Sequence, residues 1–273
     1  KRELRETRRI SIIIATRDRI DLLSRCIASI ISKTSYPNYE IILVDNESKS
    51  DEAQEYFRNC EHRVLQFHGP FNFSALNNLA VEQTTASWLL FLNNDVEVIE
   101  SEWLTIMAEH VQRPEVGAVG ARLLYPNDTV QHAGVVLGVG GIAEHAFRHF
   151  PAEAPGVSRQ LQVTRNYSSV TGACLLTRRE VFEEVGGGID LVRSSVTFFL
   201  AFDLEDQAHV LPGQRRTHRH RRGSDHGIDA PQRAAGAADD LDAVDILEHD
   251  VLHVPKNAGE ERRVDAAAIN KHQ

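Results

Sequence analysis

The chain has 273 residues, of which 42% are hydrophobic, and this is enough to bury one large core or two small ones. Its formal net charge of -9 at pH 7 argues against a nucleic-acid binder, which needs a concentrated basic face, so we expect no nucleic-acid partner. No run approaches the ~20 consecutive apolar residues that span a bilayer.

The first eight positions, residues 1–8, form a basic N-terminal extension. The apolar run behind them is too short for a signal peptide, because Arg17 and Asp18 follow it at once. We therefore expect a cytoplasmic protein. The three cysteines lack the C-x-x-C spacing of a zinc site, and we expect reduced, buried thiols at Cys26, Cys60 and Cys174.

The next segment has the pattern of a strand, a helix and a second strand. ISIIIAT (10–16) and YEIILVD (39–45) are short apolar runs, and DLLSRCIASIISKT (21–34) between them carries apolar residues at helical spacing. This pattern predicts a βαβ unit whose parallel strands are buried on both faces.

Strands and helices continue to alternate. SDEAQEYF (50–57) and SALNNLAVEQTT (74–85) predict helices, the second with Ser74 as its N-cap, while RVLQFHG (63–69) and SWLLFL (87–92) predict strands. The fold class that follows is α/β, with a doubly wound, mostly parallel sheet and helices on both faces. Such sheets bind ligands beyond the carboxyl ends of their strands.

After this alternation the pattern changes. EWLTIMAEHVQ (102–112) predicts a helix, VGAVGARLLYP (116–126) a strand, and GVVLGVGGIAEHAF (134–147) strand and loop. SSVTGACLLTRREVFEEVGG (168–187) predicts a strand that enters a helix ending at the two glycines. No G-x-G-x-x-G follows the first strand, which disfavours a Rossmann dehydrogenase.

The end of the chain differs in composition. No aromatic residue follows Phe202, although aromatic side chains contribute much of the buried area of a folded domain. We expect residues 203–273 to be a divergent, weakly packed or disordered tail. The basic run QRRTHRHRR (214–222) lacks interleaved aromatic residues and is interpreted as a solvated loop.

Polar residues follow three of the predicted parallel strands, and they should share one edge of the sheet. A carboxylate there can accept hydrogen bonds from a base or a ribose, or coordinate a divalent ion that bridges phosphates. A single one is more readily an N-cap or an Asx turn, whereas three together favour a nucleotide site. The three groups are Thr16-Arg17-Asp18, Asp45-Asn46 and Asn93-Asn94-Asp95.

Five segments, in this order, resemble the motifs of family 2 glycosyltransferases, the inverting nucleotide-sugar enzymes of the GT-A fold. They are SIIIATRDRIDLLSRCIASI, YEIILVDNES, FNFSALNNLAV, LLFLNNDVEVI with the EWL that follows it, and VTGACLLTRREVFEEVGG. YPNDTVQHAGVVLGVGG is similar to the bacterial polysaccharide, rhamnosyltransferase-like branch. The resemblance implies a GT-A domain with a nucleotide-sugar-binding half at 9–100 and an acceptor-side half at 101–202.

The resemblance also implies site residues. Asp45 matches the aspartate that reads the ring N–H of uracil or thymine, and Asp95 matches the DxD residue that binds Mg²⁺ or Mn²⁺ on the diphosphate. The remaining donor-binding residues that it implies are Ala15, Thr16, Arg17, Asn77, Asn78, Asn93 and Asn94.

The catalytic base of relatives lies in an acidic segment after the Gly-Gly stop, where this chain has FFLAFDLEDQAHVL. Leu204 falls on the base position, and the candidates beside it are Asp203, Glu205 and Asp206. On the acceptor side, His132 either contacts the acceptor or a phosphate or packs in a loop. Gly172 and Ala173 either let a ligand approach the backbone closely or form a simple bend.

Two hypotheses follow. The first is an inverting, metal-dependent glycosyltransferase that moves a sugar from a UDP- or dTDP-sugar to a glycan or lipid-linked glycan, in the cytoplasm or at the inner face of the plasma membrane. The second is a nucleotide-binding but catalytically inactive module of a polysaccharide-assembly protein, because the acidic segment departs from the family pattern.

Overall fold

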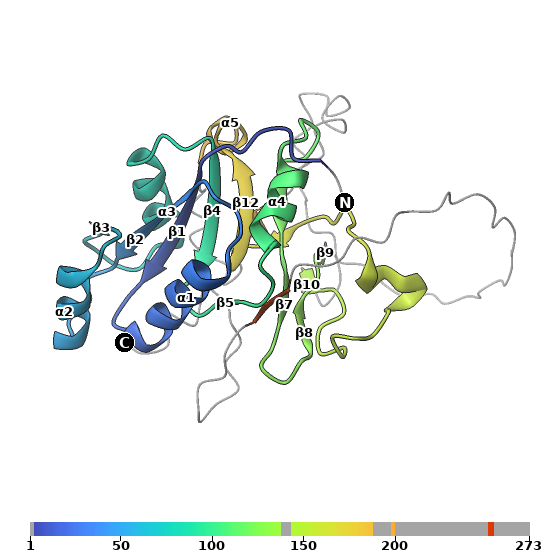
Figure 1. Ribbon diagram of the computed structural model, residues 1–273, viewed down its shortest axis with the longest axis horizontal. Coiled ribbons are helices and arrows are strands. Elements are labelled where there is room, and N and C mark those ends of the chain that lie inside the picture. The colour runs from blue at the N-terminus through green and yellow to red at the C-terminus, as the bar shows by residue number, and fades with distance from the viewer. Residues whose placement is uncertain (1–2, 138–142, 188–197, 200–250, 254–273) are drawn as a thin grey trace, which may run out of the picture.

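The computed structural model describes residues 3–137, 143–187, 198–199 and 251–253 (Figure 1). Its centre is a six-stranded sheet in the order β3-β2-β1-β4-β12-β6. The first four strands of that order are parallel, and β12 runs antiparallel to its neighbours, which confirms the doubly wound, mostly parallel sheet. The strands are β1 (Ile10–Thr16), β2 (Tyr39–Asp45), β3 (Arg63–Gln66), β4 (Trp88–Asn93), β6 (Ala118–Gly120) and β12 (Cys174–Arg178).

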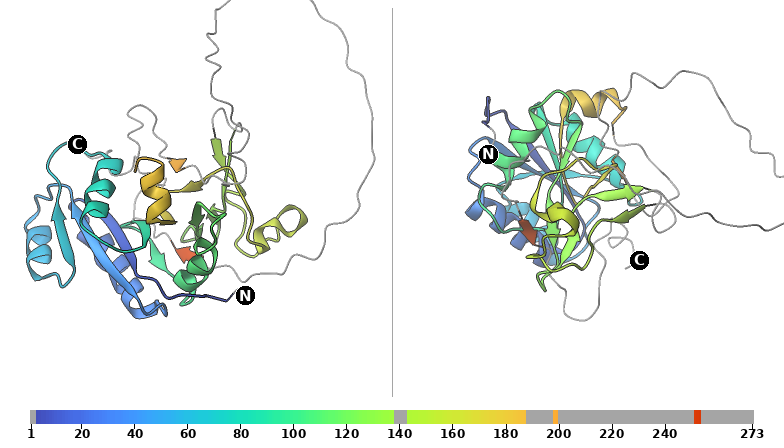
Figure 2. Two further views of the ribbon diagram at one scale, coloured as in Figure 1. Left: turned by 90° about the horizontal axis from the view of Figure 1, so that it is seen from above. Right: turned by 90° about the vertical axis from the view of Figure 1, so that its right-hand side faces the viewer.

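Helices cover both faces of this sheet (Figures 1 and 2). On one face, α1 and α4 pack against Ile10, Ile12 and Ile14 of β1, and on the other face α3 and α5 pack in the cluster of Ile13 and Ala15. This alternation is that of a strand buried on both sides. The helices are α1 (Ile20–Lys33), α2 (Asp51–Asn59), α3 (Phe73–Glu82), α4 (Trp103–Val111) and α5 (Arg179–Glu184).

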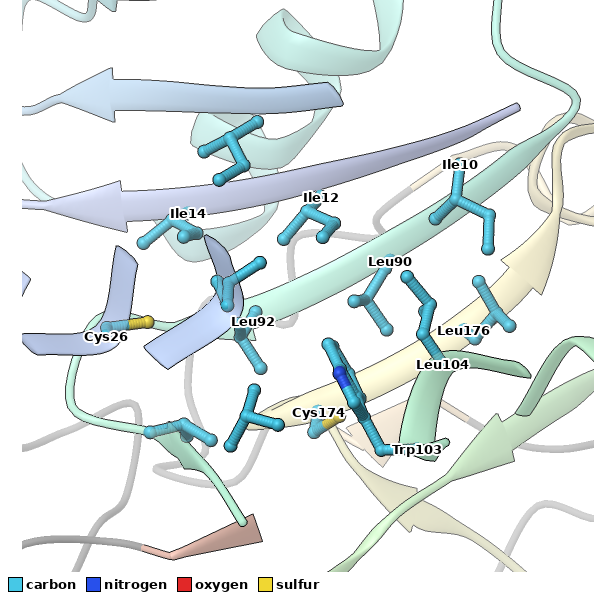
Figure 3. Close-up of a cluster of buried hydrophobic side chains, with 14 of the residues drawn as sticks. Ile10, Ile12, Ile14, Cys26, Leu90, Leu92, Trp103, Leu104, Cys174 and Leu176 are labelled. Carbon is cyan, nitrogen blue, oxygen red and sulfur yellow. The ribbon is translucent and has the colours of Figure 1, made fainter. Parts of the chain in front are cut away.

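The larger core lies under α1 and α4. Figure 3 shows Ile10, Ile12 and Ile14 of β1 facing the side chains of both helices. Trp88 and Trp103 are 1% and 0% exposed, so each is a core residue. Burying an aromatic side chain of this size contributes about 2–3 kcal/mol relative to leaving it in water. The sheet is thus held by apolar contacts along its whole length.

Two helix ends show how well local signals place boundaries. The prediction of Ser74 as the N-cap of α3 is wrong, because the side chain of Asn72 accepts the N–H of Ala75 at 2.8 Å and Ser74 lies within the first turn. The end of α5 at the two glycines is confirmed, since Gly186 and Gly187 have φ values of 86° and 79°. Glycine adopts this left-handed conformation without strain.

The strand predicted over 116–126 is instead two strands in different sheets. β6 stays in the main sheet, and after Ala121 the chain enters β7 in a second sheet of order β5-β14-β7-β8. Gly120 lets the chain pass close to Val170 at this point, because a Cβ there would lie 2.6 Å from the Cβ of Val170. The elements beside the main sheet are β5 (Glu97–Val98), β7 (Arg122–Leu124), β8 (Val130–His132), β9 (Val135–Leu137), β10 (Ala143–His145), β11 (Val170–Thr171), β13 (Phe198–Phe199), β14 (Val251–His253) and the 3₁₀ helix η1 (Val157–Gln162).

Two further expectations concern the state of the cysteines and the presence of membrane-spanning helices. All three cysteines are free thiols, and Cys26 and Cys174 are buried, whereas Cys60 is only partly buried. Among the helices that the structure describes, none has the length and hydropathy to cross a bilayer. The predicted tail, apart from the three residues of β14, lies outside the described residues.

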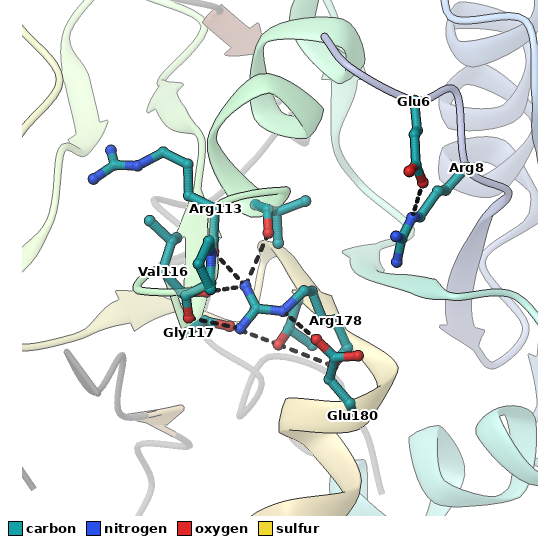
Figure 4. Close-up of polar contacts among 10 residues, drawn as sticks. Glu6, Arg8, Arg113, Val116, Gly117, Arg178 and Glu180 are labelled. Carbon is teal, nitrogen blue, oxygen red and sulfur yellow. Dashed lines mark hydrogen bonds and ion pairs between the residues drawn. The ribbon is translucent and has the colours of Figure 1, made fainter. Parts of the chain in front are cut away.

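Arg178 joins the end of α4 to the end of β12 (Figure 4). The last carbonyl groups of a helix have no partner within the helix and must find one elsewhere. Arg178 is only 5% exposed, and its Nε bonds Glu180 at 2.8 Å. Its other two nitrogens donate to the carbonyl oxygens of Val111, Arg113, Pro114 and Val116 at 2.6 to 3.0 Å.

We predict that Arg178→Met lowers the free energy of unfolding by about 3 kcal/mol, because several buried carbonyl groups lose their donor at once. Denaturation in urea measures this change. The control is Glu6→Gln, which removes the exposed ion pair between Glu6 and Arg8 in Figure 4 and should change stability by less than about 0.5 kcal/mol. Equal effects of the two substitutions would contradict this role of Arg178.

Candidate functional site

The carboxyl ends of β1, β2 and β4 meet at one edge of the sheet, which we call the rim. Thr16 pairs with Asp45, and Ala15 pairs with Asn93. β12 begins at the same edge, where the carbonyl oxygen of Ala173 accepts the N–H of Asn93 at 3.0 Å. The structure therefore brings together these five residues, which come from four separate segments of the sequence.

Asp45 is buried at the rim with one oxygen unpaired. Its side chain is 0% exposed, and Oδ1 accepts both the N–H and the hydroxyl of Ser48, at 3.0 and 2.5 Å. Among the described residues, Oδ2 has no hydrogen-bond partner. A buried acceptor without a donor costs about 1–3 kcal/mol, so Oδ2 is suited to accept a hydrogen bond from a ligand.

Asp18 and Ser48 close the loops that follow β1 and β2. The N–H of Asp18 donates to Oγ of Ser48 at 2.9 Å, and Oδ1 of Asp18 accepts the N–H groups of Lys49 and Ser50 at 2.6 and 2.9 Å. Asp18 thus ties the loop after β1 to the loop after β2, which is neither a helix N-cap nor a local Asx turn. The sequence reasoning missed Ser48, although its position three residues after a strand-ending aspartate allows the local side-chain contact with Asp45.

The residues after β4 are held by side chains of β1 and α1. Nδ2 of Asn94 donates to Oγ1 of Thr16 at 3.0 Å, and Sγ of Cys26 donates to the carbonyl oxygen of Asn93 at 3.7 Å. Burial raises the pKa of the Cys26 thiol, and the Asp95 carboxylate raises it further, so this donor keeps its proton. These contacts orient the loop from two sides.

Asp95 is partly buried at the start of the next segment, with its Oδ1 inaccessible and unpaired within the described residues. Burial raises the pKa of the Asp95 carboxyl to about 6, because the ionised form loses hydration, and the positive charge of Arg19 opposes this shift. Arg19 carries no signal in the sequence that marks it as a neighbour of Asp95. A cation at Oδ1 would satisfy the charge that burial disfavours.

The donor set fits a divalent ion that is shared with a ligand. The described part of the chain holds no group of three or more His, Cys, Asp or Glu side chains that could cage a metal. Mg²⁺ commonly binds through one or two carboxylates and completes its shell with substrate phosphates and water. The unpaired oxygen of Asp95 fits this mode.

The structure also describes the surroundings of the other predicted donor-side and acceptor-side residues. Arg17 is partly buried directly after β1, and Nδ2 of Asn77 bonds the Phe73 carbonyl oxygen within α3 at 2.8 Å. Oδ1 of Asn78 lies against Gly187, 3.1 Å from where a Cβ would stand. Gly172 is buried at the turn before β12.

The two remaining predictions concern His132 and the catalytic base. His132 is the last residue of β8 in the second sheet and is 1% exposed. The three candidate bases, Asp203, Glu205 and Asp206, lie outside the described residues, so their role stays a prediction.

A family model assigns the chain to a protein family. The model described as glycosyl transferase family 2 matches residues 11–186, a span that includes every rim residue. This chain belongs to glycosyl transferase family 2. Its mostly parallel sheet with helices on both faces is accordingly of the GT-A type that the resemblance implied.

Two curated relatives are similar over most of this family 2 chain. The uncharacterized protein y4gI of Sinorhizobium fredii is 46% identical over 183 residues, which are 65% of this chain and 20% of the relative. The O-antigen biosynthesis protein RfbC of Myxococcus xanthus is 46% identical over 193 residues, which are 67% of this chain and 15% of the relative. The chain thus spans one fifth or less of the length of these relatives.

Solved structures to which the chain is similar match it at low identity. A mannosyltransferase of Pyrobaculum calidifontis in complex with GDP-Man and Mn²⁺ is 15% identical with a TM-score of 0.49, covering 70% of this chain and 50% of that one. TarS 1–349 of S. aureus is 13% identical with a TM-score of 0.45, covering 68% of this chain and 52% of that one.

The raised pKa of Asp95 predicts a pH-dependent effect of Asp95→Asn on the ligand-free protein. A carboxyl whose pKa is about 6 when folded and near 3.8 when unfolded is destabilising once the pH exceeds the unfolded value, and the penalty is complete above the folded value. The substitution should therefore raise the free energy of unfolding by about 2–3 kcal/mol at pH 8 and by about 1 kcal/mol at pH 4.5.

Urea unfolding at the two pH values, without metal or nucleotide, measures this difference. Asp51→Asn is the control, because Asp51 is exposed on α2 and should give a small effect at both pH values. A loss of stability in Asp95→Asn at pH 8 would contradict the inferred burial of charge.

Proposed function

We propose that this family 2 chain is an inverting, metal-dependent glycosyltransferase that moves a sugar from a UDP- or dTDP-sugar to a glycan or lipid-linked glycan. The observation that carries the proposal is the pair of buried, unpaired carboxylate oxygens at the rim, Oδ2 of Asp45 and Oδ1 of Asp95. The first calls for a hydrogen-bond donor and the second for a cation. A nucleotide diphosphate with a divalent ion supplies both.

Asp45 is suited to bind the base of the nucleotide. Ser48 occupies Oδ1 with its N–H and its hydroxyl, which leaves Oδ2 as the acceptor. Uracil and thymine each present one ring N–H between two carbonyl groups, and this N–H matches a single acceptor. The fixed carboxylate needs little reorganisation when the base binds, which favours affinity.

Asp95 is suited to the diphosphate end of the donor. A bound Mg²⁺ or Mn²⁺ would act there as a Lewis acid that offsets the charge developing on the leaving nucleoside diphosphate. The protein's own part is to hold the carboxylate: Asn94 is tied to Thr16, and the Asn93 carbonyl to Cys26, so the loop carrying Asp95 is fixed before the ligand arrives.

Inversion follows from a single displacement in which the acceptor hydroxyl attacks the anomeric carbon opposite the leaving group. A carboxylate must take the hydroxyl proton in line with this attack. We assign this step to one of Asp203, Glu205 and Asp206, the carboxylates next to Leu204, which stands at the position of the base in relatives.

The acceptor is proposed from the kind of relatives that the chain has. One of them is named for O-antigen biosynthesis, which supports a growing glycan or lipid-linked glycan as acceptor. We place the reaction in the cytoplasm or at the inner face of the plasma membrane, where nucleotide sugars are available. The chain corresponds to a small part of that relative, so the role of the whole protein belongs to the proposal as well.

The alternative is a nucleotide-binding module without transferase activity. It is favoured by the acidic segment, in which Leu204 stands where relatives carry the base. Both hypotheses require the donor site at Asp45 and Asp95, and only the first requires turnover.

Calorimetric titration with UDP and with dTDP, each with and without Mn²⁺, tests the donor site. Asp45→Asn replaces a charged acceptor by an amide and should weaken both nucleotides by about 10-fold or more, with or without metal. Asp95→Asn should abolish the gain in affinity that Mn²⁺ gives to the wild type. The exposed control Asp51→Asn should match the wild type in every titration.

Failure of both nucleotides to bind the wild type would overturn the proposed donor site. If the wild type binds UDP or dTDP but neither hydrolyses UDP-glucose or dTDP-rhamnose nor transfers their sugars, the inactive module is favoured. An Asp95→Asn variant that keeps its response to Mn²⁺ would place the metal elsewhere.

A further inference from the structure

A buried histidine lies at a corner between β8 and β9, remote in sequence from the rim. Nε2 of His132 accepts the N–H groups of Gly134 and Thr171, at 3.3 and 3.4 Å. Because Nε2 accepts, the ring proton sits on Nδ1, which lies 2.9 Å from Nδ1 of His145 and donates to it. Both nitrogens of His132 are thus engaged with the protein, and neither can contact a ligand directly.

The ring is suited to stay neutral. Burial lowers the pKa of His132 well below its usual value, because the charged ring would lose its hydration. The two rings meet edge to face with their centroids 5.0 Å apart. Nε2 therefore keeps its lone pair, and with it the hydrogen bond to Thr171, throughout the neutral pH range.

Other contacts press the same segment, residues 167–173, against this corner. The N–H of Val135 donates to the carbonyl oxygen of Ser169 at 3.0 Å. Gly134 has a φ of 105°, and the ring of Tyr167 lies 2.3 Å from where a Cβ would stand, so no other residue fits there. The corner thus holds the segment through an aromatic contact and through hydrogen bonds.

The segment leads directly to the rim. Oγ1 of Thr171 accepts the N–H of Ala173 at 3.3 Å, and the carbonyl oxygen of Ala173 accepts the N–H of Asn93 at 3.0 Å. A continuous set of contacts therefore runs from His132 through Thr171 and Ala173 to Asn93, two residues before Asp95. Gly172 and Ala173 directly precede β12 and lie on the side of the rim where that strand begins.

We propose that His132 is a positioning residue for glycosyl transfer, which fixes residues 171–173 as the wall beside the donor sugar through its hydrogen bond to Thr171. This inference rests on the proposed function, and it assigns His132 a role through the backbone rather than a contact with acceptor or phosphate. A wall displaced by about 1 Å can cost 10²-fold in rate without weakening nucleotide binding, because the base and diphosphate contacts lie on other strands.

The test compares His132→Leu, which removes all three hydrogen bonds of the ring, with His132→Gln, whose amide oxygen can still accept near the position of Nε2. In His132→Leu, amide hydrogen exchange at Thr171 and Ala173 should rise by about 10-fold or more, and kcat for sugar transfer should fall by about 10- to 100-fold. UDP affinity should stay within about 2-fold of the wild type. His132→Gln should recover most of the kcat and of the exchange protection.

Two further variants keep the comparison decisive. Thr171→Val is nearly isosteric and removes only the Oγ1 contact with Ala173, so it should lower kcat while the protein stays folded, even where His132→Leu does not fold. His110→Gln is the matched control for loss of a buried histidine. His110 lies in α4 at the opposite end of the sheet, where Arg178 pairs with Trp88, and its substitution should leave exchange at Thr171 unchanged.

The outcomes separate this inference from the proposed function. Unchanged exchange at Thr171 in His132→Leu, or raised exchange with unchanged kcat, would overturn the positioning role. Parallel losses of UDP affinity and kcat would also overturn it, since they indicate general unfolding. A wild type that binds UDP without turnover removes the proposed transferase, and exchange at Thr171 then still decides whether His132 holds this segment.

Discussion

The position of the site depends on the parallel pairing of β1 with β2 and β4. All seven residues of β1 are buried and pair with Tyr39–Asp45 on one side, and the six residues from Ile10 to Ala15 pair with Trp88–Asn93 on the other. A slip of one residue would move Ile12 and Ile14 from one apolar cluster to the other and would separate Thr16 from Asp45 at the rim. The pairing register of β1 therefore determines which residues reach the rim.

The polar residues of the rim lower the stability of the fold, whereas the apolar core beneath them raises it. Asp45 and Asp95 each bury an oxygen that no described residue satisfies, and the network of Asp18, Ser48 and Asn94 fixes the loops around them rather than pairing these oxygens. Such an arrangement persists when the surrounding structure is strong enough to enforce it. The isoleucine-rich core beneath the rim supplies that strength, and a ligand that donates to Asp45 and brings a cation to Asp95 would relieve the strain.

The sequence predicted the parts of this structure that short-range patterns control. The β1, α1 and β2 segments, and the placing of Asp45 and Asn93 at strand ends, followed from periodicity and strand order. Long-range contacts decided the rest. The close approach of Gly120 to Val170 joins residues fifty positions apart, and Arg19 and Asp95 become neighbours only when the loops fold against each other. The cap at Asn72 was missed because two polar residues near the helix start offered equivalent local signals.

The two sides of the rim differ in the same way. The donor side is built from loops that directly follow parallel strands, so residues within three positions of a strand end, such as Ser48 and Asn94, suffice to orient it. The side formed by β12 comes from an antiparallel strand, whose first residues are held by Thr171 and, through it, by His132 some forty residues earlier. Substitutions in the second sheet can therefore displace residues 171–173 without altering the residues at the ends of the parallel strands.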